Sequence, residues 1–234
     1  MTDELGWVPI ALSATIEAGT SAGVILDGAE IVVWRDSKGA AHVWEDRCPH
    51  RGMRMSFGFV RGDHIACLYH GWQYDAGGQC QYIPAHPDLE VPKTIKIPTY
   101  AVEERNGVIW TSLAEAADIA GVPSLDEEAV AVRSLYLDCG LEAIRAGLAG
   151  VSLPVSGGAN QQAGISDLNS HCWLLTAGST RLLVAGQKVG AHKSALHLVL
   201  LGAPEATTPL RAGIARWAEA LRLTLEAHTM AEVA

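Results

Sequence analysis

The sequence has 234 residues, which suffice for one large domain or two small ones. Apolar residues make up 49% of it and charged residues 18%, so the chain can bury a core. The same composition argues against a long disordered tail. Its 17 Lys and Arg face 26 Asp and Glu, a net charge of −9. That balance disfavours partners held by phosphate neutralisation, and we expect no nucleic-acid ligand.

Membrane insertion and secretion are also disfavoured. The longest apolar stretches, such as 196–201, fall far short of the ~20 residues that a spanning helix needs. The first four residues, Met-Thr-Asp-Glu, have the wrong charge for a signal peptide. Five cysteines are too few, and odd in number, for a secreted disulfide scaffold. We therefore expect a soluble cytoplasmic protein without membrane association.

The first half of the chain is rich in short β segments. Apolar runs alternate with Gly-rich turns between residues 23 and 110, a pattern typical of a small antiparallel sandwich or barrel. The predicted strands are Val24–Leu26, Glu30–Trp34, Ala41–Trp44, Ile65–Cys67, Trp72–Asp75 and Gly107–Trp110.

After residue 112 the pattern changes to α+β. Residues 113–130 are predicted to be a connector, and residues 151–170 a loop. Short apolar runs predict strands at 135–137, 171–176, 182–185 and 196–201, and residues 141–148 predict a short helix. A final helix is predicted with Thr208 as N-cap and Pro209 in its first turn. Its apolar stripe comprises Leu210, Ile214, Trp217, Leu221 and Leu225.

Two short motifs carry the chemistry. Cys48-Pro49-His50 and Cys67-Leu68-Tyr69-His70 place two thiols and two imidazoles in paired loops. Such a set serves either a tetrahedral zinc ion or a [2Fe–2S] cluster in which two His replace two Cys on one iron. Both uses remain open on these residues alone.

The residues around the two motifs favour the cluster. Cys48-Pro49-His50-Arg51-Gly52 and Cys67-Leu68-Tyr69-His70-Gly71-Trp72, with Tyr74-Asp75 after them, closely resemble the Rieske domain of ring-hydroxylating and demethylating oxygenases. The resemblance implies an all-β Rieske [2Fe–2S] domain over residues 1–112. It implies that Cys48 and Cys67 bind one iron, and that His50 and His70 bind the other, near solvent.

The resemblance also separates two branches of Rieske proteins. Those of respiratory complexes brace the loops with a disulfide, which needs one more Cys in each loop, and neither loop here has one. The oxygenase branch implies a reduction potential toward the low end of the Rieske range, about −150 mV.

In the resembled oxygenases a larger C-terminal domain holds a mononuclear Fe(II) on two His and a carboxylate. The family writes the first part as an acidic residue, two spacers, a His, four spacers and a His. The matching region here holds Glu142 and Arg145 but no His, and the only His pair with four spacers is His192 and His197, without an acid before it. We therefore expect residues 131–234 to form a shortened oxygenase helix-grip domain, and no mononuclear Fe(II) on this chain.

Other residues have plain interpretations. We expect His42, His64, His86, His171 and His228 to be surface or core residues, and Cys80, Cys139 and Cys172 to be buried apolar thiols. Trp72 and Tyr69 are expected to shield the cluster. One basic cluster, Arg47, Arg51, Arg54 and Arg61, is either a solvated surface or a docking face for an acidic ferredoxin or reductase.

Three functions follow. The first is an oxidoreductase component that takes single electrons from a ferredoxin or reductase. It would pass them to a mononuclear iron on a partner subunit, within a trimer-like homo- or hetero-oligomer. The second is a self-sufficient monooxygenase or demethylase with an atypical iron site, using His192, His197 and Asp167 or Glu205. The third is a non-catalytic regulatory or structural Rieske subunit.

Overall fold

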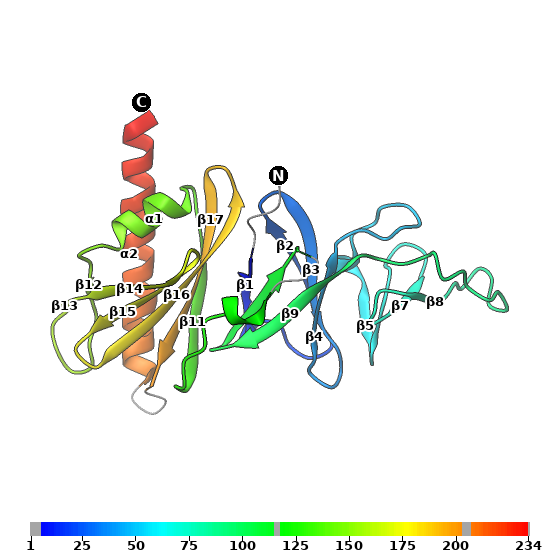
Figure 1. Cartoon of the computed structure of the whole chain (residues 1–234), viewed down its shortest axis with the longest axis horizontal. Helices are drawn as coiled ribbons and strands as arrows, with labels where there is room; N and C mark the ends of the chain where they lie inside the picture. The colour runs from blue at the N-terminus through cyan, green and yellow to red at the C-terminus, as the bar shows by residue number, and fades with distance from the viewer. Residues whose placement is uncertain (1–5, 115–117, 203–206, 234) are drawn as a thin grey trace. The chain divides into compact units, whose positions relative to one another are not determined.

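A computed structural model describes residues 6–114, 118–202 and 207–233 (Figure 1). The chain divides into two compact units. Residues 14–103 make up most of the first unit and residues 119–234 most of the second, to which residues 7–13 and 104–110 also belong. None of the described helices is long and apolar enough to cross a membrane.

The first unit contains two antiparallel sheets. In one, the hydrogen-bonded order is β9-β4-β3-β2, from β2 (Ser21–Leu26), β3 (Ala29–Arg35), β4 (Ala41–Glu45) and β9 (Thr99–Arg105). In the other, the order follows the chain through β5 (Phe59–Arg61), β6 (His64–Ala66), β7 (Gln73–Asp75) and β8 (Cys80–Tyr82). Short 3₁₀ turns at Ser13–Thr15 and Met55–Phe57 complete the elements near this unit.

Two tight hairpins show how local sequence sets the strand pairing. Asp27 and Gly28 join β2 to β3 with φ angles of 47° and 83°. Asn106 and Gly107 join β9 to β10 (Val108–Ser112) in the same way, at 51° and 73°. An Asp-Gly or Asn-Gly pair with two positive φ angles is the turn that matches the natural twist of paired strands.

The second unit is built on a five-stranded antiparallel sheet. Its order is β11-β17-β16-β15-β14, from β11 (Ala129–Leu137), β14 (Gly164–Asn169), β15 (Cys172–Ala177), β16 (Thr180–Gly190) and β17 (Lys193–Leu201). The long helix α2 (Thr207–Val233) runs across one face of this sheet, and the short helix α1 (Leu141–Gly147) lies beside it (Figure 1). The unit also contains β1 (Val8–Leu12), β12 (Ser152–Leu153), β13 (Gln161–Gln162) and a 3₁₀ turn at Ile119–Gly121.

The core of the second unit confirms the predicted helix stripe. Leu210, Ile214 and Leu225 are buried, and Trp217 and Leu221 pack against the same cluster. Opposite them, the inward side chains of the sheet include Leu182, Leu196 and Leu198. The stripe covers apolar sheet residues that would otherwise meet water.

The fold class is confirmed, with local corrections. The predicted loop over residues 151–170 is wrong in part, because the strands β12, β13 and β14 lie in it. Polar strands such as β13 and β14 lack the apolar alternation that marks a half-buried strand, and pairing with a neighbour specifies them instead. The strand predicted at 135–137 starts at Ala129, and α2 starts one residue before the predicted cap.

Candidate metal centre

Two loops of the first unit share one backbone geometry. In the first loop, Cys48–Gly52, the Gly52 N–H donates to the Cys48 carbonyl (2.8 Å) and the Cys48 N–H donates to the Met53 carbonyl (2.8 Å). In the second loop, Cys67–Gly71, the equivalent bonds join Gly71 to Cys67 (2.9 Å) and Cys67 to the Trp72 carbonyl (2.8 Å). Each loop is therefore a one-turn bend closed on its own cysteine.

The closing glycines explain why the two loops have the same shape. Gly52 and Gly71 have φ angles of +71° and +70°, in the left-handed region that other L-residues rarely adopt. This conformation reverses the chain immediately after each loop, so the next residue can pair back with the cysteine N–H. A glycine four residues after each cysteine is thus part of the motif.

The two cysteines meet in the interior. Cys48 is 2% exposed and Cys67 is 3% exposed, and their thiols hydrogen-bond to each other. That contact, followed by the Tyr74 hydroxyl, lowers the pKa of Cys48 against the effect of burial. The same contact and burial raise the pKa of Cys67 above its usual range. The thiol of Cys48 is thus the one of the pair that ionises more easily, and a thiolate is the form that binds a metal.

Backbone N–H groups of the loops point at both sulfurs. The His50 N–H donates to the Cys48 sulfur, and the Tyr69 and His70 N–H groups donate to the Cys67 sulfur. Hydrogen bonds of this kind stabilise thiolates and are among the features that set the potentials of iron–sulfur clusters.

The two histidines lie side by side at the outer edge of the loops. The rings of His50 and His70 are 4.5 Å apart, centroid to centroid. The ring of Trp72 stacks on His50 at 4.3 Å with an interplanar angle of 4°, while the ring of Tyr69 lies 3.9 Å from His70. His50, covered on one face by Trp72, is half-buried, whereas His70 is exposed.

Tyr74 is a functional candidate that the sequence reasoning did not single out for this contact. Its side chain is fully buried on β7, and its hydroxyl lies 3.2 Å from the Cys48 sulfur. Burial raises the pKa of Tyr74, so the hydroxyl keeps its proton and donates to the sulfur. Its place in the sequence could have pointed to this contact. The strand β7 follows the second loop directly, and alternate residues of a strand face the core.

Together these residues form a set of metal-binding atoms in which the sulfurs and the nitrogens lie on opposite sides. Two buried sulfurs form the inner end and two imidazoles form the outer end. This segregation suits a two-iron cluster, which needs two sulfur ligands on one iron and two nitrogen ligands on the other. All five cysteines of the chain are free thiols, so no disulfide competes for the two sulfurs.

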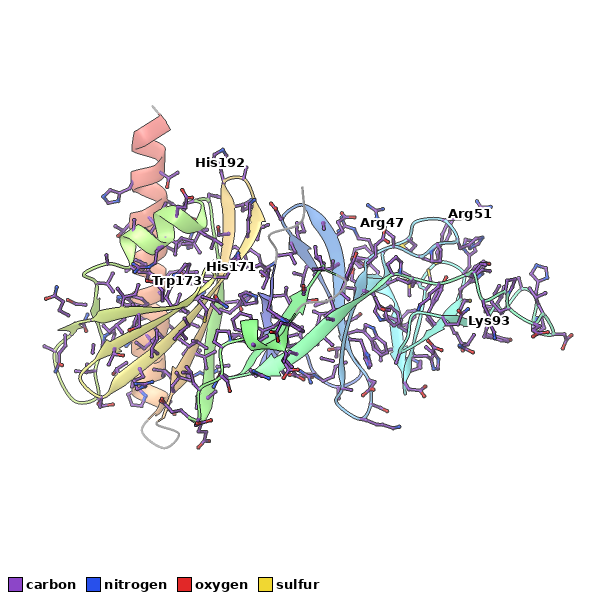
Figure 2. The ribbon with its side chains drawn as sticks, in the orientation of Figure 1. Arg47, Arg51, Lys93, His171, Trp173 and His192 are labelled. Atoms are coloured by element: carbon purple, nitrogen blue, oxygen red, sulfur yellow. The ribbon has the colours of Figure 1, made fainter. Side chains whose placement is uncertain are left out.

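In the predicted basic cluster, most of the arginines contact other side chains. Arg47 and Arg54 both form ion pairs with Glu30, and the Arg61 guanidinium lies 5.4 Å from the centre of the Phe59 ring. Arg51 is exposed and has no partner among the described residues; Figure 2 shows it and Arg47 beside the loops.

In the second unit the predicted histidine pair does not converge. His192 is exposed in the turn between β16 and β17 (Figure 2), whereas His197 is 2% exposed on β17. The Ser134 hydroxyl lies 2.8 Å from Nδ1 of His197, and the Gln187 side-chain carbonyl lies 3.0 Å from Nε2. Both ring nitrogens are therefore engaged, and burial lowers the pKa of His197 to about 4.

The two acids predicted as possible iron ligands with those histidines are Asp167 and Glu205. The Asp167 carboxylate accepts two hydrogen bonds from Arg145, at 2.6 and 2.8 Å, and Glu205 lies outside the described residues. Within the described part of the chain, no three His, Cys, Asp or Glu side chains form a group that could hold one metal ion.

A pocket of about 570 Å³ opens between α1 and the β14–β15 hairpin of the second unit. Its wall is largely apolar and includes Leu141, Ala146 and Trp173, with the Arg145–Asp167 ion pair among its lining residues.

The remaining cysteines and histidines have the expected plain roles. Cys80, Cys139 and Cys172 are buried, and burial raises the pKa of each thiol. His42 stacks on Trp34 at 4.3 Å and lies 3.2 Å from the Asp36 carboxylate.

Comparison with known proteins places the centre in a family. Residues 6–101 match the Rieske [2Fe-2S] domain. The oxidoreductase NdmD of Pseudomonas putida is 40% identical over 110 residues, which cover 47% of this chain and 19% of NdmD. The 3-chlorobenzoate-3,4-dioxygenase oxygenase subunit of Comamonas testosteroni is 34% identical over 122 residues, covering 51% of this chain and 28% of the subunit. The chain thus spans less than a third of the length of these two relatives.

The fold comparison extends further along the chain. The crystal structure of apo dicamba monooxygenase superposes with a TM-score of 0.80 at 18% identity, covering 94% of this chain and 85% of that chain. At this identity the likeness shows a shared fold. Residues 6–101 therefore match a Rieske [2Fe–2S] domain, and the fold of the chain is similar to that of dicamba monooxygenase.

Proposed function

We propose that this protein is an oxidoreductase component of a Rieske oxygenase or demethylase system and works as its one-electron relay in the cytoplasm. Cys48 and Cys67 bind one iron of the [2Fe–2S] cluster, and His50 and His70 bind the other. The observation that carries the proposal is the segregated donor set, with hydrogen-bonded sulfurs inside and adjacent imidazoles at the edge.

The bound cluster supplies reversible one-electron chemistry. The chain's residues determine how readily that electron arrives and leaves. Backbone N–H groups and the Tyr74 hydroxyl donate to the sulfurs, which favours the more negative reduced state. Trp72 covers one face of His50, so the exposed His70 offers the shorter path to a partner.

The electron donor is a ferredoxin or reductase, and the acceptor is a mononuclear iron on another subunit of a homo- or hetero-oligomer with trimer-like geometry. The second unit supports this division of labour. Helix α1 carries Glu142 and Arg145 where the family pattern requires an acid and a histidine, and Arg145 is paired with Asp167. Residues 1–112 would then act as the electron-transfer domain, 113–130 as connector and 131–234 as the subunit-contacting domain.

Metal analysis tests the proposal directly. Anaerobically purified protein should contain about two irons and two acid-labile sulfides per chain, and dithionite reduction should give a Rieske-type EPR spectrum. One zinc without sulfide would refute it. A cluster that no ferredoxin or reductase reduces at a useful rate would instead indicate the regulatory or structural role.

A second candidate, a self-sufficient oxygenase with an atypical iron site, is favoured by the apolar pocket of about 570 Å³. That size lies within the range of ligand sites, ~300–1,000 Å³. It requires a third iron without extra sulfide and substrate-dependent O₂ uptake. Ala146→Phe fills the pocket and should abolish the uptake, whereas Ala143→Phe, on an exposed part of α1 outside the lining, should not.

A further inference from the structure

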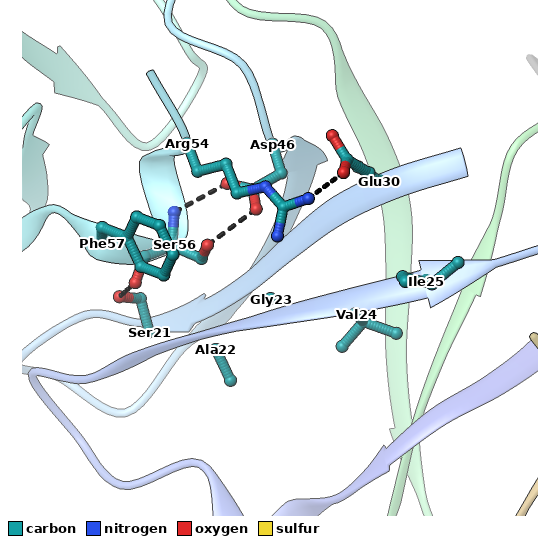
Figure 3. A pocket seen from close by; sticks show the side chains of 10 residues that line it. All are labelled: Ser21, Ala22, Gly23, Val24, Ile25, Glu30, Asp46, Arg54, Ser56 and Phe57. Atoms are coloured by element: carbon teal, nitrogen blue, oxygen red, sulfur yellow. Dashed lines mark hydrogen bonds and ion pairs between the residues drawn. The ribbon is translucent and has the colours of Figure 1, made fainter. Parts of the chain in front are cut away.

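One carboxylate holds both ends of the first loop. Glu30 on β3 forms ion pairs with Arg47, which precedes Cys48, and with Arg54, which follows Gly52. Each of its two oxygens takes one guanidinium. Glu30 and Arg54 also line an open cavity of about 400 Å³ against β2 (Figure 3).

The contacts of Glu30 continue into the loop backbone. The Arg47 guanidinium also donates to the carbonyl of Gly52 (3.2 Å), so the arginine spans the loop from its first flank to its closing glycine. The Glu30 carbonyl accepts the N–H of Asp46 (3.0 Å), and the Asp46 carboxylate accepts both the backbone N–H and the hydroxyl of Ser56, each at 2.7 Å. Both flanks of the first loop are therefore tied to β3.

The Asp46–Ser56 contact is itself closely packed against β2. A Cβ at Gly23 would lie 3.1 Å from the Ser56 hydroxyl and 3.4 Å from the Asp46 carboxylate, so the glycine allows the strand to approach (Figure 3). The second loop has no comparable support. Its flanks and its residues 67–71 form no ion pair with any described side chain except the contact between His64 and the neighbouring Asp63. The first loop thus depends on side-chain electrostatics that the second loop does not use.

We propose that Glu30 is a positioning residue that fixes the first loop through Arg47 and Arg54 and offsets their positive charge beside the cluster. This inference rests on the proposed function, because it needs Cys48 and His50 to be cluster ligands. Each ion pair is partly exposed and weak by itself, but one carboxylate holding two arginines forms a network.

Glu30→Gln should have two effects. The first loop loses its charged anchor, so the cluster should be lost to a chelator about three- to tenfold faster than in the wild type. Two arginines also become unpaired, and added positive charge stabilises the reduced cluster, so the reduction potential should rise. A residue with a merely structural role would change the first quantity and leave the second unchanged.

Glu17→Gln is the matched control, because Glu17 is an exposed acid of the same unit without a charged partner among the described residues. It should change neither quantity. Glu30→Gln with Arg54→Gln restores the net charge and should return the potential toward the wild-type value while cluster loss stays fast. Circular dichroism of each variant verifies the fold.

Failure of this inference differs from failure of the proposed function. Wild-type protein without a [2Fe–2S] cluster would refute both. A wild-type cluster whose loss rate and potential are the same in Glu30→Gln would refute the role of Glu30 alone. A changed loss rate with an unchanged potential would reduce Glu30 to a structural residue and also overturn the proposal.

Discussion

Two histidine pairs, one in each unit, differ in whether their ring nitrogens are available to a metal. His50 and His70 sit beside two buried thiols, and neither ring hydrogen-bonds to another residue in the described part of the chain. His197 is buried with both nitrogens engaged, and His192 is exposed in a turn. His192 and His197 are the closer pair in sequence, but among the described residues only His50 and His70 keep free ring nitrogens near other metal-binding atoms.

The largest expected effect tests that difference. His50→Ala or His70→Ala removes one of two nitrogen ligands, so iron and sulfide should fall from about two each per chain to near zero. The visible absorption and the EPR spectrum of the reduced protein measure the loss. His192→Ala and His197→Ala should each retain a full cluster. Retention of the Rieske spectrum in His50→Ala or in His70→Ala would contradict the proposal that these histidines bind the cluster.

The two loops of the first unit were predictable because their candidate ligands lie close together in the sequence. Each loop carries its cysteine, its histidine and its left-handed glycine within five residues, so the sequence alone predicts the loop and the ligand types. The link between the loops was not predictable from spacing. Tyr74 reaches Cys48 from 26 residues away, and Glu30 reaches Arg54 from 24 residues away. Such contacts depend on strand pairing rather than on any short pattern.

The second unit was harder to predict for a related reason. The residues around His197 come from three strands, β11, β16 and β17, whose register brings Ser134 and Ala185 opposite it. The spacing of His192 and His197 suggested a possible metal site. The sequence did not show that Ser134 and Gln187 would lie at the ring nitrogens of His197. Strands with polar residues, such as β14, were likewise missed because tertiary pairing overrides their weak propensity.

The next largest effect concerns acid stability and belongs to His197. Its pKa is about 4 in the folded protein against 6.5 for an exposed histidine, because burial disfavours the charged ring. Between pH 6.5 and 4, His197 therefore binds a proton in the unfolded chain but not in the folded chain. Stability should be unaffected above pH 6.5, fall between pH 6.5 and 4 by about 3 kcal/mol, and level off below pH 4.

Urea unfolding followed over this pH range measures that loss. His197→Gln removes the titrating group, so the part of the pH dependence due to this residue should disappear, although the variant starts from a lower stability. His192→Gln is the control and should keep the wild-type pH profile. An equal slope in the wild type and His197→Gln would mean that other groups cause the acid sensitivity.

A smaller effect distinguishes the two sulfurs. Tyr74→Phe removes the hydroxyl that donates to Cys48, and a hydrogen bond to a cluster sulfur favours the reduced state. Loss of about 1 kcal/mol from that state should lower the reduction potential by about 40 mV. Protein-film voltammetry measures the shift. Tyr82→Phe, at an exposed ring on β8, should leave the potential unchanged, and an unchanged potential in Tyr74→Phe would show that the hydroxyl does not act on the cluster.

The smallest effect concerns the free charge beside the cluster. Because Glu30 occupies Arg47 and Arg54, Arg51 is the arginine of the predicted cluster that remains exposed without a partner among the described residues. Arg51→Ala should slow reduction by an acidic ferredoxin about threefold at low ionic strength, and the difference should vanish at high salt, because charge steers encounter only when unscreened. Stopped-flow kinetics measure it, with the exposed Arg216→Ala on α2 as control. Equal rates for Arg51→Ala and the wild type at low salt would mean that the exposed aromatic edge at Tyr69 and His70, rather than charge, selects the donor.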